Sequence, residues 1–165
     1  MSTETRRDIF LLLVIFLLST AGMTSVFMHC RTLAWIVILV SDLHLCIVLL
    51  LAALQSDDEG FLDRHSWTMG FLPRRRTAGL VVVILLFLAV ISGFAGLYVG
   101  GEVFPSVKTP LDAFYISSFT LALTDYTPKP GYGQLVVLAQ LVSSVLLLVA
   151  LFPLLISRIS TFKHL

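Results

Sequence analysis

A single carboxylate, Asp125, lies in a short polar segment (residues 124–128) that separates two apolar stretches. Hydroxyl groups of Thr124 and Thr127 flank it, and Pro128 closes the segment. A carboxylate with hydroxyl groups beside it is suited to binding a cation, which is the chemistry of many ion-selective pores. The alternative is a loop cap, in which Asp125 accepts hydrogen bonds from its own backbone.

Two further ionisable residues, Asp42 and His44, lie inside an apolar stretch. Ionisable side chains at membrane depth are functional candidates, because burying them in hydrocarbon is costly. Positions two apart lie on different faces of a helix, so they do not form an obvious pair. Two interpretations are open: a neutral Asp42 hydrogen-bonded to a neighbouring helix, or a proton-sensitive contact that couples this helix to the rest of the chain.

Four apolar stretches are long enough to cross a bilayer, which requires roughly 20 residues. They are residues 9–28, 33–54, 77–100 and 134–156. Only 13% of the chain is charged, against about a quarter in soluble proteins. The sequence therefore predicts an all-α membrane protein with four transmembrane helices. In the third, Gly93 and Gly96 permit close helix approach. Cys30 and Cys46, in or beside the spans, are interpreted as small apolar residues.

Positive charges concentrate on one side of the predicted spans. That side carries Arg6, Arg7, Arg64, Arg74, Arg75, Arg76, Arg158 and Lys163, and the other carries Arg31, Lys108 and Lys129. By the positive-inside rule, both termini are cytoplasmic and residues 101–133 face outward. We expect a multi-pass protein of the plasma (inner) membrane. The arginines at 74–76 also suit anionic lipid headgroups, although setting the topology explains them equally well.

The outward segment contains a helix that is too short to cross the membrane. Thr109 is a predicted N-cap, Pro110 suits the first helical position, and Asp112 is favourable at the positive end of the helix dipole. A helix over residues 110–123 is about 20 Å long, roughly two-thirds of the hydrocarbon core. We expect it to enter the membrane and the chain to return; the alternative is a lid lying flat on the outer leaflet.

Residues 112–126 read DAFYISSFTLALTDY, to be compared with the pattern D-A-L-Y-F-S-x-x-T-L-T-T-V-G-Y-G-D. The residues that match in register are Asp112, Ala113, Tyr115, Ser117, Thr120, Leu121 and Tyr126. The segment thus resembles the pore helix and filter of tetrameric potassium channels, and the resemblance covers residues 77 to about 159. It implies an outer helix, a re-entrant pore helix, a filter loop and an inner helix, assembled as a homotetramer.

The filter departs from that family pattern. Where the family has V-G-Y-G-D, this chain has Thr124, Asp125, Tyr126, Thr127 and Pro128. The resemblance implies that the family's glycines let the backbone present its carbonyl groups to ions. β-Branched Thr127 is disfavoured in left-handed conformations, and Pro128 pushes it toward extended geometry. We therefore expect that the usual carbonyl ladder does not form.

A filter made of side chains is the expected replacement. Four subunits would place four Asp125 carboxylates in a ring, with Thr124 and Thr127 hydroxyl groups nearby and Thr120 at the end of the pore helix, an arrangement that selects cations. The carboxylates repel one another, so protons or cations are expected to neutralise part of the charge and make conduction pH-sensitive. K⁺, Na⁺ and Ca²⁺ are the candidate ions. Two placements of Lys129 are open: a pair with Asp125, which would silence the ring, or a side chain that points to solvent.

The fourth apolar stretch carries a polar stripe. Gln140, Ser143 and Ser144 lie at i, i+3 and i+4, so they share one helix face. Such a stripe faces protein or water, and it either lines a vestibule or packs against another helix. Pro153, further along, is expected to kink the helix, at a place similar to the bend of voltage-gated family members.

These expectations divide the chain into a peripheral helix hairpin (residues 1–56), a cytoplasmic juxtamembrane linker (57–76) and a pore-like domain (77–165). The hairpin lacks the spaced arginines of a voltage sensor. The leading hypothesis is a homotetrameric cation channel that is weakly selective or prefers sodium or divalent cations. The alternative is a non-conducting, channel-like sensor, accessory or interaction subunit. No enzyme motif or nucleic-acid-binding face is recognised, so the bilayer and inorganic cations are the expected partners, with no other cofactor.

Overall fold

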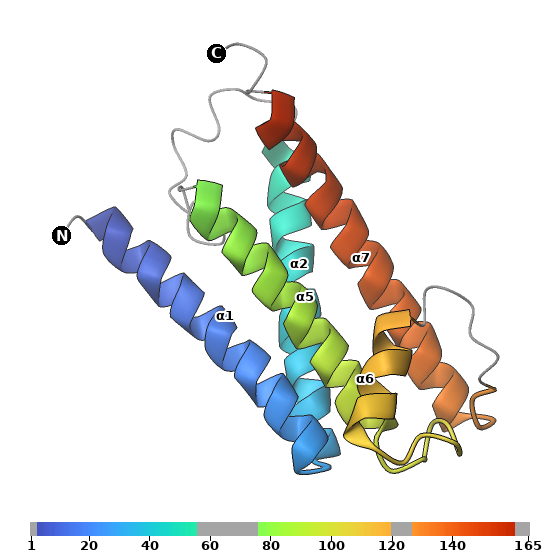
Figure 1. Cartoon of the computed structure of the whole chain (residues 1–165). Coiled ribbons are helices and arrows are strands. Elements are labelled where there is room, and N and C mark those ends of the chain that lie inside the picture. The colour runs from blue at the N-terminus through green and yellow to red at the C-terminus, as the bar shows by residue number, and fades with distance from the viewer. Residues whose placement is uncertain (1–2, 56–75, 120–126, 161–165) are drawn as a thin grey trace.

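The computed structural model describes residues 3–55, 76–119 and 127–160. Its helices, in chain order, are α1 (Thr3–Phe27), α2 (Arg31–Gln55), α5 (Arg76–Tyr98), α6 (Pro110–Phe119) and α7 (Tyr132–Ser160) (Figure 1). All of them except α6 are long and apolar enough to cross a membrane. No strand occurs in these three ranges. The prediction of an all-helical chain with four helices of membrane-spanning length and composition is confirmed.

The four long helices begin one to six residues before the apolar stretches from which they were predicted, whereas α1 and α5 end one and two residues before those stretches do. α1 begins at Thr3, because charged residues such as Arg6 are good helix formers outside the hydrocarbon layer. α7 runs to Ser160 and includes Pro153 as one continuous helix. The proline therefore does not end the helix, and the kink stays a prediction.

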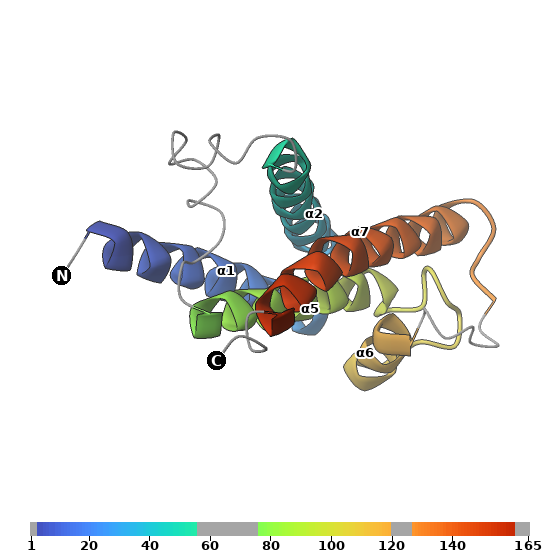
Figure 2. The ribbon, with the colours of Figure 1, turned by 90° about the horizontal axis from the view of Figure 1, so that it is seen from above.

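α5 is the central helix and packs against all the others, whereas α1 also packs on α2, and α2 on α7 (Figures 1 and 2). Glycines allow the closest of these approaches. A Cβ atom on Gly96 would lie 2.3 Å from Oγ of Ser25 on α1, and one on Gly93 would lie 2.8 Å from the Ile38 side chain on α2. The predicted role of the two glycines in helix packing is thus confirmed.

The helix ends sort to opposite ends of the bundle. The start of α1, the end of α2, the start of α5 and the end of α7 lie at one end of the bundle, where the helices are spread apart, and the loops at residues 28–30, 99–109 and 127–131 lie at the other end (Figures 1 and 2). We call the latter the loop end. This arrangement is what the predicted topology requires, with an even number of crossings between the termini.

α6 begins at the loop end and runs back alongside α5, at one side of the bundle (Figures 1 and 2). Its start has the predicted cap. The Asp112 N–H donates to Oγ1 of Thr109 at 3.2 Å, and that hydroxyl and the Thr109 N–H donate to Oδ2 of Asp112 at 2.6 and 3.3 Å. This reciprocal arrangement is a capping box. The described part of this helix has ten residues and reaches Phe119, the last residue before a range that lies outside the described residues.

Candidate functional site

A buried side-chain amide joins the three helices α5, α6 and α7. Gln140 of α7 is only 3% exposed, and its Nε2 donates to the backbone carbonyl of Ser117 on α6 at 2.7 Å. The buried Tyr98 hydroxyl on α5 donates to Oε1 of the same amide. Ser117 Oγ in turn donates to the Ile91 carbonyl on α5 at 2.7 Å. The C-terminal half of α6 is therefore hydrogen-bonded to both of its neighbours.

These contacts bear on the polar stripe predicted for α7. Gln140 and Ser143 are buried and hydrogen-bonded to other helices, and Ser144 is half-buried. Of the two interpretations, helix packing agrees with the contacts of Gln140 and Ser143 within one subunit. A pore-lining role for the three residues stays a prediction.

The loops before and after α6 are joined to each other. The Lys129 N–H donates to the Val103 carbonyl at 2.8 Å, and a Cβ atom on Gly133 would lie 3.0 Å from that oxygen. Val103 itself is fully buried, and the Phe104 ring packs edge-on against Tyr98 with centroids 5.0 Å apart. The chain that follows the predicted filter is thereby fixed to the folded loop at 99–109.

Asp42 is hydrogen-bonded to a neighbouring helix, as the first of its two interpretations predicted. Ser143 Oγ on α7 donates to Oδ2 of Asp42 on α2 at 2.6 Å, and the Ser143 hydroxyl also lies 3.0 Å from the Ala139 carbonyl. Within the described part of the chain, Oδ1 of Asp42 is buried and accepts no hydrogen bond. His44, on the same helix, is half-buried. The proton-sensitive interpretation of this contact stays a prediction.

Replacing Ser143 with alanine is expected to lower the free energy of unfolding by about 1–3 kcal/mol, because Asp42 loses its donor in an apolar environment. In an Asp42→Leu background the same replacement is expected to cost less than about 0.5 kcal/mol, because no acceptor remains to be left unpaired. Thermal unfolding in detergent measures both, with Ser144→Ala as the matched control. Equal losses in the two backgrounds would contradict the assignment.

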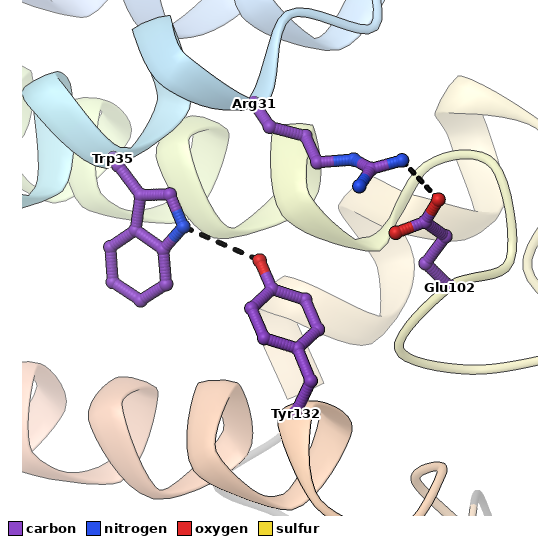
Figure 3. Close-up of polar contacts among 4 residues, drawn as sticks. All are labelled: Arg31, Trp35, Glu102 and Tyr132. Atoms are coloured by element: carbon purple, nitrogen blue, oxygen red, sulfur yellow. Dashed lines mark hydrogen bonds and ion pairs between the residues drawn. The ribbon is translucent and has the colours of Figure 1, made fainter.

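The loop end of α2 makes two further contacts (Figure 3). Arg31 pairs with Glu102 in the 99–109 loop, and Trp35 Nε1 donates to the Tyr132 hydroxyl at the start of α7 at 3.3 Å. Positions 31, 35 and 42 share one face of α2. Through this face α2 contacts the 99–109 loop once and α7 twice. Sequence reasoning missed the first two contacts because the partners are 71 and 97 residues apart. Their signal was an arginine and an aromatic residue one helical turn apart at a membrane interface.

Six of the remaining predicted site residues lie outside the described residues: Thr120, Thr124, Asp125, Tyr126, Arg74 and Arg75. Thr127 is exposed at the loop end, and Arg76 is the first residue of α5. Across the described ranges, no three His, Cys, Asp or Glu side chains are grouped so that they could hold a metal ion.

Comparison of the chain with known protein families, with curated proteins and with solved structures gives no match. The fold and the contacts therefore define the class: a chain that is helical over its described residues, with four helices long and apolar enough to span a membrane and a shorter helix, α6, that packs on α5 and is hydrogen-bonded to α5 and α7.

Proposed function

We propose that this chain is one subunit of a homotetrameric cation channel of the plasma membrane, with both termini in the cytoplasm. The observation that carries the proposal is α6. A ten-residue helix is too short to cross a bilayer, yet α6 starts at the loop end, runs back beside α5 and is hydrogen-bonded to α5 and α7 through Ser117 and Gln140. In the proposed channel α5 is the outer helix, α6 the pore helix and α7 the inner helix.

The physics of the short helix favours an aqueous path beside its end. Backbone that leaves a helix at membrane depth needs hydrogen-bond partners, so it must be covered by protein or line water. A helix C-terminus also carries a partial negative charge, equivalent to roughly half an elementary charge, which favours cations. Four such ends around an axis would attract cations even before the side chains of the filter are considered.

The filter is proposed to consist of side chains from residues 120–127. Asp125 supplies the charge, and the Thr120, Thr124 and Thr127 hydroxyl groups supply further oxygen atoms beside Tyr126. Because this ring lacks the family's glycines, the channel is proposed to be weakly selective or to prefer sodium or divalent cations to potassium. Gln140, Ser143 and Ser144 would lie behind or along the path, and Pro153 is the proposed bend near its inner end.

Neighbouring subunits are proposed to cover the apolar face that α6 leaves exposed. Leu111, Tyr115 and Phe119 are 80%, 57% and 49% exposed in the single subunit. The Tyr115 and Phe119 rings contact each other in a tilted arrangement, with centroids 4.9 Å apart and their planes at 40°. Aromatic side chains on a helix that does not span the bilayer are suited to contacts between subunits around a pore.

The alternative is a non-conducting, channel-like subunit that senses a signal or assembles with a partner. The observation that favours it is the loop after the filter, in which Pro128 restricts Thr127 and Lys129 is anchored through its backbone to Val103. The ammonium group of Lys129, four residues along the chain from Asp125, would oppose the entry of other cations.

The test is a planar-bilayer recording of the purified protein between asymmetric potassium and sodium solutions, after chemical crosslinking has established the oligomeric state. A reversal potential near zero that shifts with pH or calcium is the expected result. A value near the potassium equilibrium potential would contradict the steric argument about Thr127. A crosslinked ladder that stops at dimers, or a folded tetramer that carries no current, would favour the non-conducting alternative.

A further inference from the structure

We infer that Asp42 holds a proton in the folded chain and donates its carboxyl O–H to Ser143, which makes the contact between α2 and α7 dependent on pH. The inference does not rest on the proposed function. It concerns a contact between two helices of one subunit, and it can be tested in a protein that carries no current.

Both residues lie at mid-depth in long apolar helices. Asp42 is eleven positions after the start of α2 at Arg31, and Ser143 is eleven positions after the start of α7 at Tyr132. Each is therefore about 16 Å from the loop end of its helix, roughly half the thickness of a hydrocarbon core. Of the ten acidic residues in the chain, only Asp42 lies inside one of the four apolar stretches. An ionised carboxylate at this depth is costly.

The first argument is a count of hydrogen atoms around Ser143. Its Oγ lies 2.6 Å from Oδ2 of Asp42 and 3.0 Å from the Ala139 carbonyl oxygen. Both are hydrogen-bond distances, but a hydroxyl group has only one hydrogen to donate. If Asp42 is ionised, Ser143 serves one of the two acceptors at a time. If Asp42 is neutral, its O–H donates to Ser143 Oγ and the serine hydroxyl donates to Ala139, so both contacts are hydrogen bonds.

The second argument concerns the other carboxyl oxygen. Over the residues that the structure describes, Oδ1 of Asp42 is buried and has no hydrogen-bond partner. An ionised carboxylate carries its charge on both oxygen atoms and can accept about four hydrogen bonds. A charged Asp42 would have one donor for that capacity. In the neutral acid Oδ1 is a carbonyl oxygen, and burying it without a donor costs far less than burying a charge.

The third argument is the lack of an opposite charge on the neighbouring helices. α2 packs against α1, α5 and α7. Residues 9–27, 77–98 and 132–157 of these helices include no Asp, Glu, Lys, Arg or His, and their titratable side chains are Tyr98 and Tyr132. Both tyrosine hydroxyl groups are hydrogen-bonded to other residues, at Gln140 and Trp35.

On α2 itself, the nearest titratable side chains are His44 and Cys46. Cys46 is exposed, and a thiol supplies no positive charge. His44 is two positions from Asp42, and residues two apart lie on different faces of a helix. Neutralisation by a proton is therefore the arrangement that the contacts of Asp42 favour.

The consequence is a contact that weakens as pH rises. When the proton leaves for water, a charge remains between α2 and α7, and separating the helices would hydrate it. A folded state that holds one proton more than the unfolded state is destabilised by alkaline pH. The equilibrium constant for unfolding then rises by at most tenfold for each pH unit.

The first test is infrared difference spectroscopy at neutral pH. Asp42→Asn keeps the size of the side chain and an N–H that can donate to Ser143, but it cannot ionise. The parent chain is expected to show the carbonyl stretching band of a protonated carboxyl group, and this band should be absent from Asp42→Asn. Asp112→Asn, at an exposed acid, is the control and should leave the band unchanged.

The second test examines the role of Ser143 as the acceptor. Ser143→Ala should shift the frequency of the Asp42 band, because the carboxyl O–H loses its partner. Ser144→Ala, at the half-buried next residue of α7, should not shift it. If the band is absent from the parent, Asp42 is ionised and the inference is overturned. A band that Ser143→Ala leaves in place overturns the assigned donor.

The third test measures thermal unfolding in detergent from mildly acidic to mildly alkaline pH. The ratio of the unfolding equilibrium constants of the parent and Asp42→Asn is expected to rise severalfold per pH unit, with tenfold as the limit for one proton. Taking the ratio removes the contribution of the groups that both chains share. A ratio that is independent of pH, or that falls as pH rises, would overturn the pH-dependent contact.

Discussion

In the proposed channel, an Asp125→Asn replacement is expected to lower cation conductance on the order of tenfold or more relative to the parent chain, because focused negative charge raises the local cation concentration by about that factor or more. A tetramer would lose four carboxylates while the side chains keep their size. The dependence of conductance on pH should disappear with the charge, since an asparagine ring takes up no protons. In the parent chain, acidification is expected to lower conductance by neutralising the carboxylates.

Asp112→Asn is the matched control for this prediction. Asp112 is another exposed acid of the outward segment, and asparagine can still accept hydrogen bonds from Thr109 at the start of α6. Its conductance should stay within about twofold of the parent, because a solvent-exposed charge away from the axis is largely screened. Currents and cation preference that are equal in Asp125→Asn and the parent would refute the acidic ring. They would not contradict the arrangement of the helices.

A Gly96→Ala chain is expected to lose about 1–3 kcal/mol of unfolding free energy, because its new Cβ atom overlaps with α1. That atom would lie 2.3 Å from Ser25 Oγ, and the next nearest atoms are the Ala34 and Ser25 Cβ atoms at 3.1 and 3.3 Å. Ser25 cannot easily turn aside, because it is fully buried and its hydroxyl donates to the Gly22 carbonyl at 2.7 Å. The overlap must therefore be relieved by moving a helix.

Adding Ser25→Ala to Gly96→Ala is expected to restore about half of that loss, since the remaining contacts need only small adjustments. Ser25→Ala alone should cost about 1 kcal/mol, the net worth of its hydrogen bond. Thermal unfolding of the four chains in one detergent completes the cycle. If the two losses simply add, Gly96 does not contact Ser25 and the close α1–α5 packing is refuted.

Features that depend on local chemistry or on the thickness of the bilayer were predictable from the sequence. The number of spans followed from the length of the apolar stretches, because about 20 residues are needed to cross the hydrocarbon core. The α6 cap followed from Thr109, Pro110 and Asp112, whose interactions are confined to one turn. The packing role of Gly93 and Gly96 followed from their lack of a side chain within an apolar helix.

The partners of the polar residues were not predictable in the same way. Periodicity showed that Gln140 and Ser143 share a face, but a single sequence does not tell which helix that face meets. The sequence is therefore compatible with either a vestibule or a packing role for Gln140, because its partners Ser117 and Tyr98 are 23 and 42 residues away along the chain. The Asp42 contact spans 101 residues.

Sequence alone thus determined the apolar helices, the side of the bilayer each loop is expected to face, the cap of α6 and the candidate chemistry of Asp125. Tertiary structure alone decided that α5 is central, that α6 is held by an amide from α7, and that α2 reaches α7 through Asp42. The physical reason is the distance along the chain over which each kind of interaction acts. Hydropathy and capping act within a few residues of the chain, whereas buried polar side chains inside a membrane protein take their partners from whichever helix the packing brings beside them.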